Sequence, residues 1–182
     1  MGGSKALLRI DGKALAALHV ARALEAGCDR AVVVTRPDAA SRLGEIPRAT
    51  ILAAETAGQA ESLQVAARKV GMRGDVRVLV TPVDCPPASV ATLHALFAAL
   101  DHGATVATPH RDGKGGHPVA CTSAVLAPYT SKDPAAPPPL RDVLAKHETT
   151  RTRIDVDDPR VGLDLDTPED VIAFTGKPPS FV

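Results

Sequence analysis

This sequence of 182 residues has few aromatic residues, no excess of charge of one sign and no long hydrophobic run. Aromatic side chains make up 2% of it, with three Phe, one Tyr and no Trp, so the core must be mainly aliphatic. Lys and Arg number 21, and Asp and Glu also number 21. A broad nucleic-acid surface needs a basic excess, and a single-strand surface needs aromatic platforms for the bases. We therefore expect no nucleic-acid partner.

The hydrophobic runs are too short for a membrane protein, and the cysteines are too few for a disulfide-rich one. The longest uninterrupted apolar run, residues 95–100, is far shorter than the roughly 20 residues that cross a bilayer. The first residues lack the apolar stretch of a secretory signal. Cys28, Cys85 and Cys121 are widely spaced and odd in number, which suits neither a disulfide framework nor a thiolate metal site. We expect a cytoplasmic protein.

Helical and strand patterns alternate along the chain. The spacing of apolar residues predicts helices over 11–27, from 37, and over 58–70, 86–100, 140–147 and 167–174. Strands are predicted over 30–35, 49–54, 76–81, 104–108, 118–121 and 151–156, with a strand end over 162–165. Repeated strand–helix–strand units indicate an α/β fold of three layers, with helices on both faces of a mostly parallel sheet. We expect one domain over 1–175 and a flexible tail over 176–182.

One segment interrupts this alternation. Residues 131–139 contain four prolines, at positions 134, 137, 138 and 139. A long stretch without helical or strand spacing is most simply a mobile surface loop, and some such loops serve as lids. We interpret it as a surface loop, with a lid as the alternative.

Asp84 is the first candidate functional residue. It follows the predicted strand 76–81 within a few residues and precedes Pro86 and Pro87. Ligands of such sheets bind at the carboxyl ends of strands, where a carboxylate suits Mg²⁺ that carries phosphates. Asp is also a common N-cap, so Asp84 could simply begin the next helix. Both interpretations stay open on the residues alone.

A second group of carboxylates lies over residues 164–170. Asp164 and Asp166 alternate with leucines, so on an extended chain their side chains share one face. Either could join Asp84 in holding a metal. Alternatively, Asp166 or Thr167 could cap the helix that begins near Pro168. We favour Asp164 as the metal ligand and Asp166 as the cap.

Three glycine-containing segments complete the candidates. Gly58 opens a predicted helix, where free amides and the hydroxyl of Ser62 suit a phosphate or a nucleotide edge. Residues 113–118 contain three glycines, a lysine and His117, and there the backbone can approach a ligand closely. Residues 2–5 place Lys5 after two glycines. Each segment alone is as typical of a plain turn.

Taken in order, these segments resemble the MobA-like nucleotidyltransferase family, in particular the branch of the molybdenum cofactor cytidylyltransferases. The family begins with a strand, a glycine-rich loop that ends in Gly-x-x-Lys, and an apolar helix, and here Gly2 to Lys5 match the end of that loop. Four further elements follow in the family's order: Gly58 to Leu63, Asp84-Cys85-Pro86, Gly116-His117-Pro118 and Asp164 to Asp170.

The resemblance implies a Rossmann-like fold and transfer of a nucleoside monophosphate from a triphosphate, CTP in this branch, to a phosphorylated acceptor such as molybdopterin. Lys5 and Asp84 would be the catalytic residues, with Lys5 on the phosphates. Asp84 and Asp164 would bind Mg²⁺, the cofactor. The nucleotide would contact Gly2, Gly3, Lys5, Gly58, Gln59 and Ser62, and the acceptor would contact Gly116 and His117.

The sequence departs from the family pattern at its start. The first strand, which lies in the middle of the family's sheet, and the front of the glycine-rich loop are absent from the printed sequence. We expect codons upstream of Met1 to encode them, and the chain as printed to fold but to transfer nucleotides poorly or not at all. A catalytically impaired nucleotide-binding protein is one alternative. A nucleotide-sugar glycosyltransferase is another, although its metal site usually contains Asp-x-Asp and here Asp84 stands alone.

Overall fold

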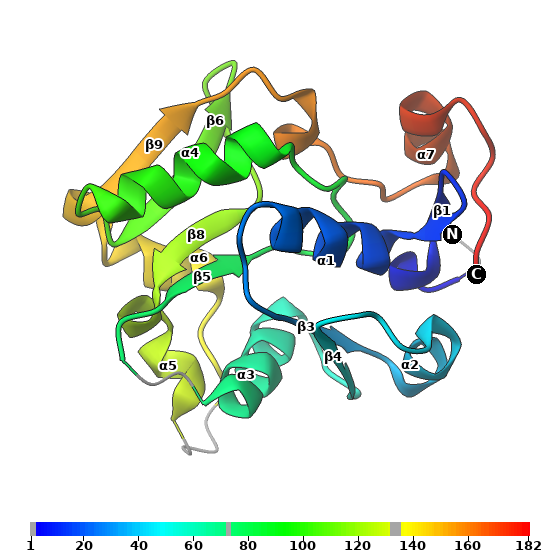
Figure 1. Cartoon of the computed structure of the whole chain (residues 1–182), viewed down its shortest axis with the longest axis horizontal. Coiled ribbons are helices and arrows are strands. Elements are labelled where there is room, and N and C mark those ends of the chain that lie inside the picture. Colours follow the sequence, from blue (N-terminus) through cyan, green and yellow to red (C-terminus); the bar gives the residue numbers. More distant parts are fainter. Residues whose placement is uncertain (1–2, 72–73, 132–135) are drawn as a thin grey trace.

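The computed structural model describes residues 3–71, 74–131 and 136–182 (Figure 1). Its α-helices are α1 (Leu15–Glu25), α2 (Pro37–Leu43), α3 (Gln59–Val70), α4 (Val90–Asp101), α5 (Ala127–Thr130), α6 (Leu140–Ala145) and α7 (Pro168–Thr175). Its strands are β1 (Arg9–Ile10), β2 (Lys13–Ala14), β3 (Ala31–Thr35), β4 (Ala49–Ala53), β5 (Arg77–Val80), β6 (Val106–Arg111), β7 (Lys114–Gly115), β8 (Val119–Thr122) and β9 (Arg151–Asp155). The α/β fold class predicted from the sequence is confirmed.

The larger sheet has five strands in the order β5-β8-β6-β7, with β9 also paired to β6. Successive side chains of a strand point to opposite faces, and the core divides accordingly. Ala107 and Ala120 pack against α4 on one face. Val106 and Val119 pack against α3, α5 and α6 on the other. The sheet is therefore the middle of three layers.

The pairing within the sheets is mixed rather than mostly parallel. The β3–β4 and β6–β9 ladders are parallel, whereas β8 runs antiparallel to both β5 and β6. The physical reason is the short connection through β7, because a parallel neighbour requires a crossover of a dozen or more residues.

The two-stranded sheet β3–β4 is not hydrogen-bonded to the five-stranded sheet in the described part of the chain. Residues 31–35 are only half-buried, although their composition predicts a strand covered on both faces. The strands of the described residues therefore form separate hydrogen-bonded sheets.

Two predicted helices begin later than expected. Asp11 and Gly12 both have positive φ, 48° and 81°, and form the two-residue turn of the β1–β2 hairpin, so α1 starts at Leu15. Helix α4 starts at Val90 rather than at Pro86, because the Ser89 side chain accepts a hydrogen bond from the N–H of Thr92 and caps it. The predicted strand end over 162–165 is a 3₁₀ turn (Pro159–Gly162) followed by irregular chain.

The tail over 176–182 is packed, in contrast to the flexible tail predicted. The N–H of Arg9 donates to the carbonyl of Ser180 at 2.7 Å, and the N–H of Val182 donates to that of Leu7 at 3.0 Å. Phe181 packs against a buried cluster that includes Leu8. The apolar Phe181 side chain was the sequence signal for this contact.

The proline-containing segment is described only in part, since residues 132–135 lie outside the described residues. At its end, the Tyr129 hydroxyl donates to the carbonyl of Pro138 at 2.8 Å. The lid interpretation stays a prediction.

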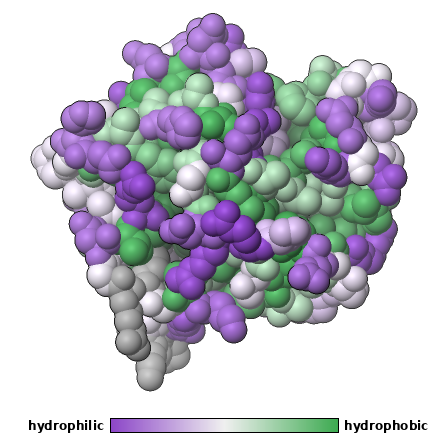
Figure 2. Space-filling view, viewed as in Figure 1, coloured by the Kyte–Doolittle hydropathy of each residue, from purple (hydrophilic) through white to green (hydrophobic). Residues whose placement is uncertain are grey.

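None of the helices described is both long and apolar enough to span a bilayer. Hydrophilic and hydrophobic side chains are interspersed over the face seen in Figure 2.

Asp158 joins the start of α4 to the 3₁₀ turn Pro159–Gly162. Its side chain is 3% exposed and accepts hydrogen bonds from the N–H of Ser89 at 2.6 Å and the hydroxyl of Thr92 at 3.0 Å. Burial alone would raise the pKa of Asp158, but these bonds and one from the N–H of Arg160 lower it below its ordinary value. The ionised carboxylate is the form that the fold stabilises.

We predict that Asp158→Ala lowers the free energy of unfolding by about 3 kcal/mol near neutral pH, because two buried donors lose their acceptor. Since the folded state lowers this pKa, the contribution is present above the unfolded value and is lost as pH falls through the folded one. Urea denaturation at about pH 7 and at about pH 3 measures both effects. An equal difference between the proteins at both pH values would contradict the role of the ionised carboxylate.

Candidate functional site

The loop that follows β5 and the segment that precedes α7 meet through one backbone hydrogen bond. The N–H of Leu165 donates to the carbonyl of Asp84 at 2.7 Å. Leu165 is 1% exposed and packs with Val171 of α7 in the cluster that also holds Leu8. Because Leu165 is anchored in this way, the preceding Asp164 is placed next to Asp84.

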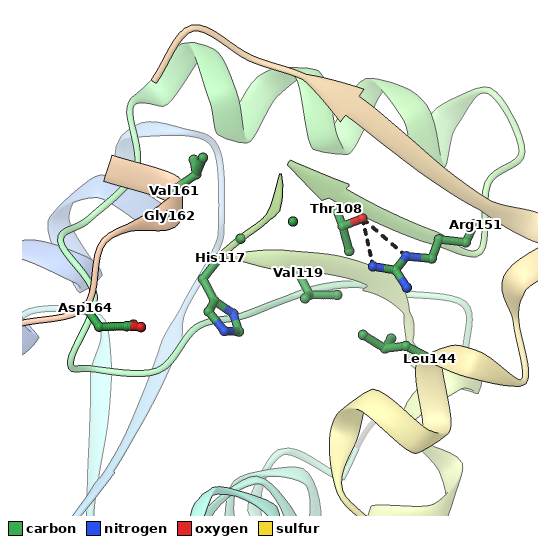
Figure 3. A pocket seen from close by; sticks show the side chains of 10 residues that line it. Thr108, His117, Val119, Leu144, Arg151, Val161, Gly162 and Asp164 are labelled. Atoms are coloured by element: carbon green, nitrogen blue, oxygen red, sulfur yellow. Dashed lines mark hydrogen bonds between the residues drawn. The ribbon is translucent and has the colours of Figure 1, made fainter. Parts of the chain in front are cut away.

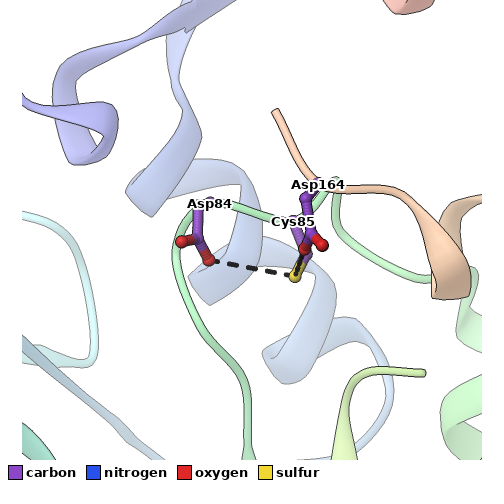
Figure 4. Close-up of side chains that lie close together, drawn as sticks. All are labelled: Asp84, Cys85 and Asp164. Atoms are coloured by element: carbon purple, nitrogen blue, oxygen red, sulfur yellow. Dashed lines mark hydrogen bonds between the residues drawn. The ribbon is translucent and has the colours of Figure 1, made fainter. Parts of the chain in front are cut away.

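Asp84, Cys85 and Asp164 each offer one ligand atom, and these atoms lie within 4.8 Å of one another (Figure 4). The Cys85 thiol donates to a carboxylate oxygen of Asp164 at 3.3 Å and lies 3.9 Å from one of Asp84. Burial, the hydrogen bond to Asp164 and nearby carboxylates raise the pKa of Cys85 well above its ordinary value. The thiol is therefore protonated, and the donors left for a cation are carboxylate oxygens, which suit a hard ion such as Mg²⁺.

Lys5 supplies the positive charge of the same site. Its ammonium pairs with Asp166 and lies 3.6 Å from a carboxylate oxygen of Asp84. Burial alone would lower the pKa of Lys5, but the hydrogen bond to Asp166 and the charge of Asp84 raise it above its ordinary value. Lys5 thus lies between Asp84 and Asp166, and Asp164 lies beside Asp84. The cluster contains three carboxylates and one ammonium, so its net charge is negative. The site can accept a cation and, with it, a polyphosphate.

His19 of α1 contacts the backbone of the loop that follows β5. Its Nε2 lies 2.9 Å from the carbonyl oxygen of Cys85. Burial lowers the pKa of His19 to about 4, so the ring is neutral at pH 7 and Nε2 carries the proton that it donates to this carbonyl. The backbone between Asp84 and Pro86 is thereby held from the α1 side.

A pocket of about 310 Å³ lies beside Asp164 (Figure 3). Gly116 and His117 line it, and Gly116 has a steric reason to be glycine, because a Cβ there would lie 1.7 Å from the carbonyl oxygen of Val161. The N–H of His117 donates to that oxygen at 2.9 Å. Burial lowers the pKa of His117, and its buried Nδ1 has no hydrogen-bond partner in the described part of the chain.

The capping interpretations of the two aspartates are wrong. Asp84 caps no helix, since α4 begins after Ser89. Asp166 pairs with Lys5, while Thr167 and Asp170 form the capping box of α7. The hydroxyl of Thr167 can reach the free N–H of Asp170, which is the geometry that favours Thr at this position.

The remaining predicted nucleotide residues lie apart from this cluster. Gly58 precedes α3, and the Ser62 hydroxyl is bonded to Thr56 at 2.8 Å and to the carbonyl of Gly58 at 3.2 Å. Gln59 is the first residue of α3, and no hydrogen bond or ion pair joins this segment to Asp84 or Lys5 among the residues that the structure describes. Gly3 packs against the Phe181 ring, and Gly2 lies outside the described residues.

Sequence reasoning missed three residues of the site. Cys85 directly follows Asp84, which was identified, and this position was the available signal. His19 and Arg151, which also lines the pocket, gave no signal, because their partners are 66 and 43 positions away in the chain.

We predict that His19→Leu lowers the free energy of unfolding by about 1–3 kcal/mol, because it leaves the Cys85 carbonyl without a donor. His19→Gln keeps an N–H donor at a similar reach and should recover part of that loss. Urea denaturation of the three proteins compares them. Equal losses in both variants would show that the side chain acts by packing alone.

A family model described as MobA-like NTP transferase domain matches residues 1–150. A search of curated proteins found no match. Three solved structures share the fold. Rv0371C of Mycobacterium tuberculosis H37Rv, in complex with manganese, has a TM-score of 0.73 and 18% identity, covering 95% of this chain and 91% of the other.

The other two structures extend the likeness. A nucleotidyl transferase from Methanothermobacter thermautotroptrophicus, Mth528, has a TM-score of 0.70 and 22% identity over 94% of this chain and 83% of its own. A CMP:2-keto-3-deoxy-manno-octonic acid synthetase in complex with CTP has a TM-score of 0.69 and 17% identity, over 94% of this chain and 90% of its own. At these identities the structures establish a common fold.

Proposed function

The chain belongs to the MobA-like NTP transferase family, and we propose that it transfers CMP from CTP to a small phosphorylated acceptor such as molybdopterin, with release of pyrophosphate. The observation that carries the proposal is the meeting of Asp84 and Asp164 beside Lys5, at one side of the pocket that Gly116 and His117 line. The complex of a fold relative with CTP supports the choice of nucleotide.

The donor set fits Mg²⁺. Asp84 and Asp164 offer carboxylate oxygens, and the protonated Cys85 thiol competes poorly for a hard cation. When bound, the ion would neutralise charge that develops on the transferred phosphoryl group. The manganese complex of another fold relative supports a divalent cation in this fold. Asp84 and Asp164 would hold the ion.

The contacts of Lys5 suggest that it binds the phosphates of the nucleotide. Its ammonium is shared between Asp84 and Asp166, and both are at least partly exposed to solvent. A triphosphate that enters with a cation offers stronger acceptors than a partly hydrated carboxylate. Lys5 would then pair with the phosphates, while Asp84 coordinates the cation.

The chemistry needs no nucleophilic side chain. An acceptor phosphate oxygen, already ionised at neutral pH, attacks the α-phosphorus of CTP. A new P–O bond forms as the bond from that phosphorus to the oxygen of the β-phosphate breaks, and the electron pair leaves with pyrophosphate. The protein has to position the two substrates and neutralise charge. Gly116 and His117 would place the acceptor, and Gly58, Gln59 and Ser62 would contact the nucleotide.

A second candidate is a nucleotide-binding protein of the same family with impaired catalysis. Gly3 is packed against the Phe181 ring rather than open to a ligand. Such a protein would bind CTP with Mg²⁺ and release little pyrophosphate. The glycosyltransferase alternative has no comparable support, since Asp84 is followed by Cys85 and Pro86 instead of a second carboxylate.

We predict that Asp84→Asn weakens the binding of CTP in the presence of Mg²⁺ by about 100-fold, because a metal ligand carries several kcal/mol of charge stabilisation. The fold should keep its stability, since Asp84 caps no helix. Calorimetric titration measures the affinity. Asp101→Asn, at the end of α4, removes the same charge from a pair with Arg77 at the start of β5, the end of that strand opposite Asp84, and serves as the matched control.

Pyrophosphate release from CTP, measured with a molybdopterin acceptor, separates the two candidates. Release that depends on Asp84 supports transfer. Tight, Asp84-dependent binding of CTP without release supports the impaired protein. Equal CTP affinity in the wild type and Asp84→Asn would remove the metal role and the proposal built on it.

A further inference from the structure

Arg151 is a charged group of the pocket that the proposed chemistry does not use. It begins β9, its side chain is 19% exposed, and it lines the pocket on the side away from Asp164, with His117 between them (Figure 3). Its Nε and Nη2 both donate to the hydroxyl oxygen of Thr108 at 3.2 Å. Thr108 is 2% exposed. One edge of the guanidinium plane is thus held by a neutral hydroxyl.

The charge of Arg151 is only partly neutralised. A carboxylate oxygen of Glu148 lies 3.7 Å from its Nη1, but the same carboxylate also pairs with Arg153. One carboxylate therefore pairs with two guanidinium groups, and the net charge of these three side chains is positive. Burial and the charge of Arg153 lower the pKa of Arg151, yet a guanidinium stays charged at neutral pH.

Apolar side chains form part of the wall between the two sides of the pocket. Val119, Leu144 and Val161 contribute side chains there, and Gly115 and Gly116 leave the backbone accessible. A partly buried cation beside apolar side chains attracts an anion more strongly than a cation in water does, because the effective dielectric constant is lower. Arginine also matches the paired oxygens of a carboxylate or a phosphate.

We propose that Arg151, held by Thr108, binds an anionic group of the acceptor that lies remote from the phosphate that reacts. The description of this ligand as the acceptor rests on the proposed function. The anion site itself rests on the geometry of Arg151 alone. The acceptor would then be a small molecule with anionic groups at two positions, one toward Asp164 and one toward Arg151.

The test uses sulfate as the probe, in EDTA and without nucleotide, so that the carboxylate site plays no part. Sulfate is titrated while the amide signal of Thr108 is followed by NMR. We expect a saturable shift in the wild type. Arg151→Gln should weaken sulfate affinity by about tenfold or more, the loss expected for a charge-assisted hydrogen bond.

Three further variants make the test specific. Arg151→Lys keeps the charge and loses the fork of donors, so its affinity should fall between those of the wild type and Arg151→Gln. Glu148→Gln removes the shared carboxylate and should strengthen binding. Arg111→Gln is the matched control, since it removes the same charge from β6 outside the pocket and should leave the affinity unchanged.

A shift that does not saturate in the wild type, or that is the same in Arg151→Gln, would overturn the anion site. Weakening by Arg111→Gln as large as that by Arg151→Gln would show a general charge effect and would also overturn it. Asp84→Asn should leave sulfate binding unchanged, so failure of the proposed transfer reaction and failure of the anion site are separate results. In an active preparation, Arg151→Gln should raise the acceptor KM and leave the CTP KM unchanged.

Discussion

The hydrogen bond from the N–H of Leu165 to the carbonyl of Asp84, 2.7 Å long, is the contact on which the site depends. It joins two segments about eighty residues apart in sequence. Leu165 is buried, so its position is set by packing, and this also fixes the position of the preceding residue, Asp164. His19 fixes the same loop at the neighbouring carbonyl of Cys85. The carboxylates are therefore placed by backbone contacts and do not depend on their own attraction to a cation.

This placement determines the electrostatics around it. Three carboxylates and the ammonium of Lys5 leave an excess of negative charge on one side of the pocket, and the excess of positive charge near Arg151 lies on the other. Like carboxylates repel at short range, and a divalent cation relieves that repulsion. A cation at Asp84 and Asp164 would also free Lys5 for a phosphate. The pocket is thus polarised along the direction in which donor and acceptor would meet.

Local patterns predicted the elements, whereas contacts distant in sequence decided the details. Short runs of β-branched and apolar residues identified β3 and β5, and the helical spacing of apolar residues identified α3. The Asp11-Gly12 turn and the Ser89 cap are also local, and they were missed because an apolar helical pattern ran across the first and prolines masked the second. Asp158 and His19 act on partners 66 positions away, and no spacing rule encodes such a pair. The order of motifs indicated that Asp84 and Asp164 act together, but only packing shows that Leu165 holds them.

Paramagnetic broadening by Mn²⁺ tests most directly whether these carboxylates form the metal site. Substoichiometric Mn²⁺, added to the ¹⁵N-labelled protein, should first remove the amide signals of Cys85 and Leu165. The signals of Asp155 and Asp157, which line a separate acidic pocket, should persist and so report nonspecific binding. Loss of the two groups of signals together, or loss at Asp155 and Asp157 first, would contradict the assignment of the metal to Asp84 and Asp164.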